Sequence, residues 1–128
     1  MNENTPCMTT SFEVIYVASP YTGTSFERNQ RFLAVEKYTA HLIREGKTAV
    51  SPIVHCHVLA FRHGLPHDFA FWQHYCLNLL FVCDEMHVLC LDGWEDSVGV
   101  LGETTEAEDL NISITYIDPE TYEAIPRG

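Results

Sequence analysis

The sequence predicts an α/β protein with three layers, α/β/α, in which a parallel sheet of four or five strands lies between helices. Short apolar, β-branched segments alternate along the chain with longer segments whose apolar residues recur at helical spacing. A β-α-β order of this kind needs crossover connections, which are almost always right-handed and produce a parallel sheet. With 128 residues, 46% of them hydrophobic, the chain (residues 1–128) is expected to form one domain around one buried core.

The N-terminal half predicts a strand, a helix and a second strand. Residues 1–11 are polar and contain a proline, so we expect a flexible lead-in. The apolar run at 12–18 predicts a buried strand that ends in turn residues. A Thr-Ser pair suited to capping then begins a helix over 24–45, which stops at Gly46, and a short run at 47–51, ended by a proline, predicts the second strand.

The C-terminal half continues the alternation after one less regular segment. Residues 55–66 show no clear period and are expected to form an irregular loop on the rigid scaffold. The later helices are predicted from apolar residues at helical spacing, and the strands from short apolar runs. In chain order these elements are a helix over 68–81, a strand over 85–91, a helix over 98–110, a strand over 112–117 and a closing turn of helix capped by Asp118.

The charge balance restricts the partners of the protein. Seven Lys and Arg against 18 Asp and Glu give a formal net charge of −11 at pH 7. Such a chain repels a phosphate backbone and gains nothing from counterion release, so nucleic acid polymers and anionic membranes are not expected as partners. A small anionic ligand is compatible with this charge, because a helix N-terminus can bind one phosphate inside an acidic protein.

The cysteines and the first residues indicate the compartment. The five cysteines are odd in number, and three of them lie in apolar stretches where thiols behave as small hydrophobes, so no disulfide framework is expected. The N-terminus has neither the basic nor the apolar region of a signal peptide, and no apolar run reaches the length of a membrane span. A cytoplasmic location is therefore expected.

The carboxyl ends of the predicted strands are the place to look for a site, since parallel α/β sheets bind ligands there. Ser97 and Gly99 stand where a helix begins, so backbone N–H groups are open to a phosphate or carboxylate. Glu103 lies one turn further on, and its side chain leans back toward the same helix end. A carboxylate and an anion cradle would then share one pocket, although capping and the helix dipole also favour these residue types at a helix start.

A set of short motifs extends this interpretation to a family. In chain order they are Ile15-Tyr16-Val17-Ala18-Ser19-Pro20-Tyr21, Ser51-Pro52-Ile53 with His55 and His57, Leu65-Pro66-His67-Asp68 before Phe71-Trp72, Cys83-Asp84-Glu85, and Gly93-Trp94-Glu95-Asp96-Ser97-Val98-Gly99 with Glu103. With these motifs the chain resembles DUF1937, a family of small bacterial and phage proteins grouped by fold with the nucleoside 2-deoxyribosyltransferases and the deoxynucleoside monophosphate N-glycosidases. The resemblance spans about residues 13–117 and implies a flavodoxin- or Rossmann-like fold of the nucleoside 2-deoxyribosyltransferase type.

The resemblance implies a role for Glu103 at an N-glycosidic bond. In the characterised relatives a glutamate at this place attacks the anomeric carbon and forms a covalent glycosyl-enzyme, as in retaining glycoside hydrolysis. A tyrosine on the first strand orients that glutamate, and Tyr16 is its counterpart here, with a core aromatic as the alternative interpretation. At the place of Ser97, nucleotide N-glycosidases carry a serine that receives the 5′-phosphate. Ser97 therefore favours a nucleotide substrate and hydrolysis. Transferases for free nucleosides carry an acidic residue at this place, so the neighbouring Asp96, which is also expected to bind substrate, counts against that preference.

The acid that helps the base to leave is where the sequence departs from the relatives. They usually place an aspartate on the helix before the third strand, and Cys76 stands there instead. A thiol has a higher reference pKa than a carboxylic acid and is a poorer proton donor for this step. Asp68 is the candidate replacement, because it shares a helix face with Cys76 and lies nearer the helix start; an N-cap role is the alternative.

Histidines and aromatic residues are expected around the same pocket. Alternation in a strand-like segment would place His55 and His57 on one side and Cys56 on the other. The two histidines can then bind a phosphate or the edge of a base, and because their spacing matches no familiar zinc pattern, no metal is expected. The expected lining residues are Ser19, Tyr21, His55, His57 and Trp94, the last as a stacking platform for a nucleobase.

The leading hypothesis is an enzyme that cleaves the N-glycosidic bond of a (deoxy)nucleoside 5′-monophosphate, or transfers its deoxyribosyl group, with Glu103 as nucleophile. No cofactor is implied, and by analogy with the relatives a homodimer or larger homo-oligomer is expected. Two other interpretations stay open. One is a non-catalytic nucleotide sensor or adaptor that kept the pocket and lost the acid, and the other is a metal-binding interaction module.

Overall fold

The sheet confirms the predicted parallel α/β architecture. The computed structural model describes residues 13–127, so the expected lead-in over residues 1–11 lies outside the described part. All strand pairs are parallel, in the order β2-β1-β3-β4. The strands are β1 (Val14–Ala18), β2 (Thr48–Val50), β3 (Glu85–Leu89) and β4 (Ser113–Ile117). Because the chain goes from β1 to β2 on one side and then crosses to β3 on the other, a topological switch point lies between β1 and β3.

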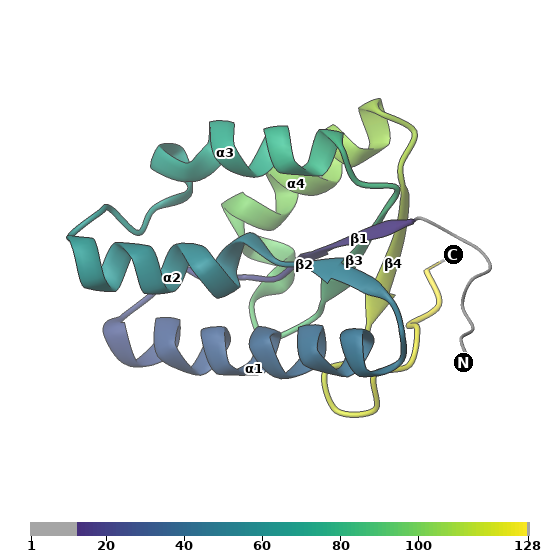
Figure 1. Cartoon of the computed structure of the whole chain (residues 1–128), viewed down its shortest axis with the longest axis horizontal. Coiled ribbons are helices and arrows are strands. Elements are labelled where there is room, and N and C mark those ends of the chain that lie inside the picture. The colour runs from purple at the N-terminus through teal and green to yellow at the C-terminus, as the bar shows by residue number, and fades with distance from the viewer. Residues whose placement is uncertain (1–12, 128) are drawn as a thin grey trace, which may run out of the picture.

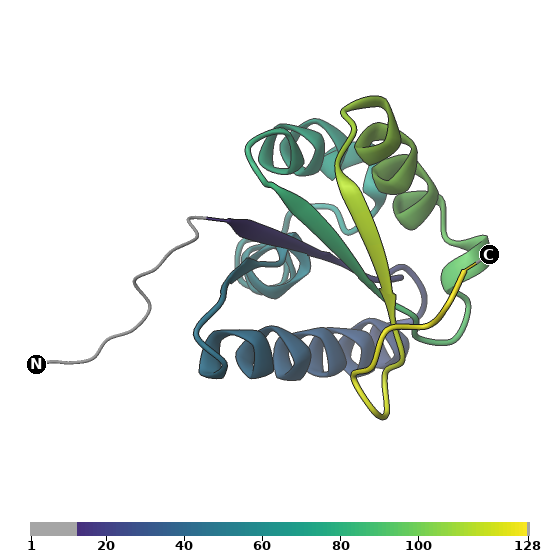
Figure 2. The ribbon, with the colours of Figure 1, turned by 90° about the vertical axis from the view of Figure 1, so that its right-hand side faces the viewer.

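Helices cover both faces of the sheet and complete the three layers. They are α1 (Ser25–Arg44), α2 (Pro52–His63), α3 (Phe69–Phe81) and α4 (Val98–Asp109), with a short 3-10 helix, η2, at Trp94–Asp96. Figure 2 shows α1 on one side of the sheet and α3 with α4 on the other. The helices predicted over 24–45, 68–81 and 98–110 therefore correspond to α1, α3 and α4, with ends that differ by one residue at most.

The side chains of β1 alternate between two apolar cores. Ile15 and Val17 pack on the side of α1, whereas Tyr16 and Ala18 pack on the side of α3 and α4. All of them are buried, as expected for a strand with neighbours on both edges and helices on both faces. Tyr16 therefore belongs to the core layer that also carries the start of α4.

The expectation of an irregular loop over residues 55–66 is wrong, because most of this segment belongs to α2. The helix begins at Pro52, whose fixed φ suits the first helical position, and it ends at Gly64 in the left-handed conformation with φ 68°. The buried residues of this helix, Pro52, Cys56 and Ala60, recur every four positions but are small, whereas the largest apolar side chain, Phe61, is 81% exposed. A pattern of large apolar residues therefore does not mark the buried face. Figure 1 shows α2 continuing beyond the carboxyl end of β2, between α1 and α3.

The closing turn of helix expected at Asp118 is a single hydrogen-bonded turn instead. The Asp118 side chain accepts a hydrogen bond from the backbone N–H of Glu120 at 2.8 Å, and the Asp118 backbone carbonyl accepts one from the backbone N–H of Tyr122 at 2.8 Å. The chain then turns back toward β4, where Ala124 forms an isolated antiparallel bridge with Ile117. The short β4 edge is thus partly covered by the C-terminal residues.

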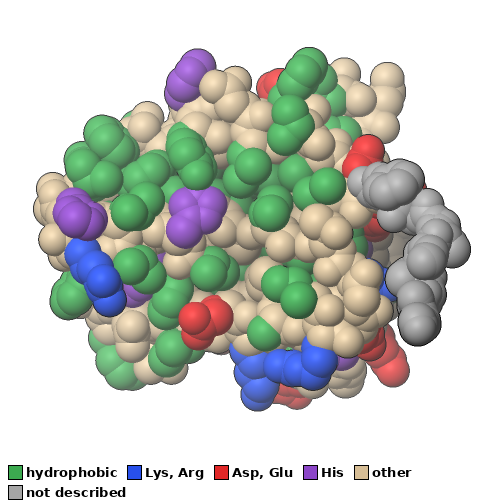
Figure 3. All heavy atoms as spheres, viewed as in Figure 1, with side chains coloured by type: hydrophobic (Ala, Val, Ile, Leu, Met, Phe, Trp, Pro, Cys, Tyr) green, Lys and Arg blue, Asp and Glu red, His purple; other side chains and the backbone are tan. Residues whose placement is uncertain are grey.

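Apolar side chains are exposed on the surface of the protein, and the described cysteines are not paired in disulfides. Within residues 13–127, the cysteines are free thiols, and no helix is long and apolar enough to cross a membrane. Figure 3 shows apolar side chains gathered over α2 and α3 on one face of the molecule. Large exposed apolar residues of these two helices are Leu59, Phe61, Phe71, Tyr75 and Phe81.

Candidate active site

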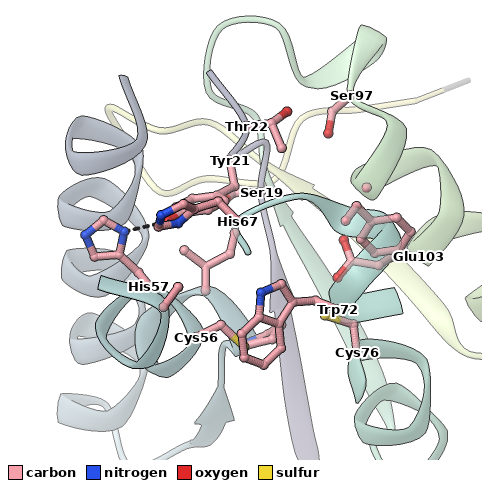
Figure 4. A pocket seen from close by; sticks show the side chains of 15 residues that line it. Ser19, Tyr21, Thr22, Cys56, His57, His67, Trp72, Cys76, Ser97 and Glu103 are labelled. Carbon is pink, nitrogen blue, oxygen red and sulfur yellow. Dashed lines mark hydrogen bonds between the residues drawn. The ribbon is translucent and has the colours of Figure 1, made fainter. Parts of the chain in front are cut away.

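A pocket opens at the carboxyl end of the sheet, where the switch point of the fold lies (Figure 4). The residues after β1, the first turns of α2 and α4, and one face of α3 surround it. It holds about 560 Å³ of empty space, including the part open to solvent. Its polar lining residues are Ser19, Tyr21, Thr22, His57, His67, Ser97 and Glu103.

Glu103 reaches one side of this pocket from α4. Its side chain is 5% exposed, and its Oε2 accepts a hydrogen bond from the Tyr16 hydroxyl on β1. Burial raises the pKa of Glu103 to about 7, while the Tyr16 hydrogen bond, which favours the ionised form, opposes part of that rise. The carboxyl group is thus held in one orientation and is partly ionised at neutral pH. Tyr16 is both the core aromatic and the partner of Glu103.

The first turn of α4 places hydrogen-bond donors in the same pocket. Ser97 caps the helix by accepting from the Val100 N–H at 3.2 Å, and both Ser97 and Gly99 line the pocket. The first N–H groups of a helix have no acceptor within the helix, and the helix dipole is positive there. The structure therefore brings together Ser97, Gly99 and Glu103, the three residues on which the predicted constellation depends.

Two glycines of α4 let this helix approach α3 closely. A Cβ atom at Gly102 would lie 2.9 Å from Cε2 of Phe69, and one at Gly99 would lie 3.3 Å from its Cδ1. The Phe69 ring therefore fits against the bare backbone of α4 and lines the pocket beside Glu103. Gly99 serves this packing as well as the access to the helix N-terminus.

Ser19, directly after β1, contributes a hydroxyl that lacks a protein partner. It is 4% exposed, and its Oγ makes no hydrogen bond within the described residues. The same holds for Ser51, which follows β2 at the start of α2. A buried hydroxyl without a partner costs stability, and a ligand oxygen in the pocket would satisfy that of Ser19.

Imidazole and phenol groups form the side of the pocket opposite Glu103. Figure 4 shows His57 at that side, joined to the Tyr21 hydroxyl. The hydroxyl lies 2.6 Å from Nδ1 of His57 and 3.5 Å from Nδ1 of His67. Trp72 also borders the pocket, where its indole N–H donates to the Pro66 carbonyl at 2.8 Å.

Two buried thiols, Cys56 on α2 and Cys76 on α3, also line the pocket. Burial, and after it the negative charge of Glu103, raises the pKa of each thiol to about 12. Both groups are therefore neutral at physiological pH and are weak proton donors. Cys76 is therefore a protonated thiol in the same pocket as Glu103.

Five predicted site residues do not line the pocket. Tyr16 is fully buried and reaches the pocket only through its hydrogen bond to Glu103. The others are Asp68, His55, Trp94 and Asp96. Asp68 is exposed at the start of α3, where it accepts from the Phe71 N–H at 3.3 Å, so the alternative interpretation as an N-cap is confirmed. The strand-like alternation that placed His55 beside His57 is wrong for a helix. His55 instead faces Tyr75 on α3, with Nε2 at 2.5 Å from the hydroxyl.

Trp94 and Asp96 lie in η2, before the helix that carries Glu103. The Trp94 ring packs against Tyr116, and the Arg127 guanidinium lies over both rings, at 5.0 Å and 4.6 Å from their centroids. Trp94 is therefore covered by the C-terminal residues instead of facing the pocket. Asp96 is exposed.

Sequence reasoning missed Cys56 and His67 as lining residues. Neighbours on a helix are 100° apart, so Cys56 and His57 can border one pocket, which alternation in a strand forbids. The Ser-Pro start and the Gly64 stop were the available signals for that helix. His67 stands in the loop before α3, and no local pattern indicates where that loop lies in space. Within residues 13–127, no group of three or more His, Cys, Asp or Glu is arranged to hold a metal ion.

Fold and site together define a doubly wound α/β protein with a buried carboxyl group in a pocket at the switch point of its sheet. The chain belongs to the family described as Domain of unknown function (DUF1937), which matches residues 13–118. All of the pocket residues lie inside that range. No curated protein matches the sequence.

Proposed function

We propose that the protein cleaves the N-glycosidic bond of a (deoxy)nucleoside 5′-monophosphate, or transfers its deoxyribosyl group, with Glu103 as nucleophile. The observation that carries the proposal is the buried Tyr16–Glu103 pair in a pocket that also contains the first turn of α4. The resemblance to a family grouped by fold with the nucleoside 2-deoxyribosyltransferases and nucleotide N-glycosidases supports the same reaction.

In this reaction Glu103 attacks the anomeric carbon with one carboxylate oxygen while Tyr16 holds the other. A carbon–oxygen bond forms to the sugar as the carbon–nitrogen bond breaks, and the base leaves with the electron pair and takes up a proton. Water, or a second base in the transfer reaction, then displaces the carboxylate from the sugar. The pKa of about 7 leaves a useful fraction of Glu103 ionised at neutral pH, and burial keeps that fraction poorly hydrated.

The first turn of α4 is the proposed site for the 5′-phosphate. The Ser97 hydroxyl and the N–H of Gly99 are the donors, and the positive end of the helix dipole favours the anion. The unpartnered Ser19 hydroxyl is suited to a sugar or phosphate oxygen of the same ligand. These contacts hold the sugar over Glu103.

A non-catalytic nucleotide sensor or adaptor is the second candidate, and the composition of the pocket favours it on one point. Among the described lining residues, Glu103 is the one carboxyl group. Cys76 is a poor acid, Asp68 caps α3 at the surface, and the remaining titratable donors are His57, His67 and Tyr21. A protein that binds nucleotides without cleaving them would have this composition. The metal-binding module has no cluster of ligands to support it among residues 13–127.

Release of free base separates these candidates. The purified protein is incubated with a panel of nucleosides and nucleoside monophosphates, and free base is measured by chromatography. We expect release from deoxynucleoside monophosphates, lost in Glu103→Ala and kept in Thr105→Ala, which changes an exposed residue of the same helix. Binding of a nucleotide without release, unchanged by Glu103→Ala, would favour the sensor.

We further propose a cytoplasmic homodimer or larger homo-oligomer, as the resemblance implies. The exposed apolar side chains of α2 and α3, such as Phe61 and Phe71, offer surface for such a contact. Light scattering on the purified protein at micromolar concentration tests this assembly, and a monomer would contradict it.

A further inference from the structure

A groove adjoins the pocket and shares two of its lining side chains. His57 and His67 border both the pocket and a neighbouring groove. The groove holds about 670 Å³ of empty space, including the part open to solvent. Its lining comes from α1, α2 and the loop before α3, and it consists of Ser25, Arg28, Asn29, His57, Phe61 and His67.

This groove gathers basic side chains in an acidic protein. The whole chain has seven Lys and Arg against 18 Asp and Glu, yet none of the residues that line the groove is acidic. The acidic residues next to the lining residues Arg28 and His67 in the sequence accept hydrogen bonds from backbone N–H groups. Glu27 accepts from the Thr24 N–H at 2.9 Å, and Asp68 accepts from the Phe71 N–H at 3.3 Å. Positive charge is therefore concentrated here without a carboxylate from the lining to balance it.

The basic side chains converge on the Tyr21 hydroxyl. Both imidazoles turn Nδ1 toward this hydroxyl, at 2.6 Å for His57 and 3.5 Å for His67, which leaves Nε2 of each ring for a ligand. Arg28 lies close enough to Tyr21 for its charge to lower the Tyr21 pKa, against the larger effect of burial. Phe32 stacks on the His57 ring with centroids 4.3 Å apart, which fixes the plane of that imidazole.

A bound anion would reduce the electrostatic repulsion among Arg28, His57 and His67. Burial lowers the pKa of His57, and the charges of His67 and Arg28 lower it further. A bound anion acts in the opposite direction and favours the imidazolium form. Arg28 donates from Nη1 to the Gly23 carbonyl at 2.7 Å, so its other guanidinium N–H groups can make the paired contacts typical of arginine with phosphate.

We propose that this groove is a phosphoryl-binding subsite in which Arg28, His57 and His67 bind one phosphate group. Ser25 and Asn29 add neutral donors, and the exposed Phe61 ring offers a stacking face for an aromatic group attached to that phosphate. The subsite is separate from the turn at Ser97 and Gly99, and its existence does not depend on cleavage of a glycosidic bond. The phosphate bound here is either a free anion or a second phosphoryl group of the ligand that occupies the pocket.

Titration with inorganic phosphate, followed by NMR of the imidazole signals and the backbone amides, tests the subsite directly. We expect saturable shifts of the His57 and His67 ring signals at pH 6, and weaker binding at pH 8, where the lowered pKa leaves His57 neutral. Arg28→Gln and His67→Gln should each weaken the binding seen at His57 by about tenfold or more. Arg62→Gln and His63→Gln change exposed residues of α2 outside the groove and should leave it unchanged.

The amide signal of Gly99 reports on the other anion site in the same spectra, which keeps the two proposals distinguishable. Loss of the response at Gly99, or absence of base release, would count against the proposed reaction and not against the groove. Absence of a saturable shift at His57 and His67, or an equal shift in Arg28→Gln with its spectrum otherwise unchanged, would overturn the subsite. A second titration with a dinucleotide identifies the source of the phosphate: simultaneous shifts at Gly99 and His57 indicate one ligand across both sites.

Discussion

The Tyr16 hydroxyl donates a hydrogen bond to Oε2 of Glu103 and so joins the central strand β1 to α4 at the carboxyl group that lines the pocket. The two side chains are 0% and 5% exposed, and 87 positions separate them in the sequence. The position of the carboxyl group therefore depends on the sheet and on the packing of α4 together, and changes to either partner should alter its chemistry in a defined direction.

Replacement of Glu103 by Gln should lower base release by about 10³-fold or more, because an amide does not act as the nucleophile. In the unmodified protein the rate should rise as pH increases through about 7, since the carboxyl group must ionise before it attacks. Rates measured from pH 5 to 9 check both points. A profile that is flat over this range would contradict a role for the ionised form.

Replacement of Tyr16 by Phe should move this profile to higher pH. The hydrogen bond from Tyr16 lowers the pKa of Glu103, so its removal leaves burial unopposed and raises that pKa above its present value of about 7. At neutral pH the rate should fall by about tenfold to a hundredfold, the size of one hydrogen bond to a charged group. If the rising limb stayed in place while the rate fell, Tyr16 would be acting through packing alone.

Glu103 should also make the fold less stable as pH rises. Its pKa is about 7 in the folded protein against 4.5 for the free group, so between these values the unfolded chain loses the proton first. Stability then falls from pH 4.5 to 7 and stays lowered above 7, by about 3 kcal/mol in all. Glu103→Gln removes this contribution. Urea unfolding at pH 4.5 and pH 8 should show the variant gaining stability relative to the unmodified protein at pH 8, and a difference independent of pH would refute the shift.

Cys76→Asp should increase base release. The aspartate places a carboxylic acid in the pocket with Glu103, and a positioned acid contributes about 10²-fold or more to the departure of the base. The buried carboxyl beside Glu103 should also lower thermal stability, because both groups resist ionisation there. Cys76→Ser, similar in size and without an acid, is the matched control and should show no gain. Equal rates in all three proteins would show that Cys76 does not occupy the acid position.

Gly102→Ala should destabilise the protein by about 1–3 kcal/mol, since the new Cβ would lie 2.9 Å from the Phe69 ring in a packed interface. Thr105→Ala, at an exposed position of the same helix, should have little effect. Phe69→Leu combined with Gly102→Ala should recover part of the loss, because the smaller side chain makes room. Denaturant unfolding measures all of these. If the double variant recovered no stability, the loss in Gly102→Ala would arise elsewhere in α4 and not from contact with Phe69.

The sheet and three of its helices follow from local patterns. Each strand segment is a short apolar run followed within four positions by Gly or Pro. The helices α1, α3 and α4 each begin at a side chain that caps the helix, Thr24, Asp68 and Ser97. The helix α2 was not predicted because the residues of its buried face, Pro52, Cys56 and Ala60, are small, while large apolar residues such as Leu59 and Phe61 are exposed. Its proline at the start and glycine at the end were consistent with a helix as well as with turns.

Local sequence patterns likewise predict one part of the candidate site but not the other. Ser97, Gly99 and Glu103 lie within the first two turns of a single helix and its N-cap, so their sequence spacing fixes their relation in space. His67 and Cys56 join them only because α2 and the loop before α3 fold over the end of the sheet, a tertiary contact that no local spacing encodes. Assignment of His55 failed for the related reason that its position depends on the period of the element that carries it.

The Arg127 guanidinium lies across Trp94 and Tyr116, and Trp94 stands three positions before Ser97. Arg127 therefore packs against the segment that leads into α4. Arg127→Ala would uncover the Trp94 and Tyr116 rings, so a loss of ligand binding in this variant would be transmitted through that segment, since none of the three side chains lines the pocket.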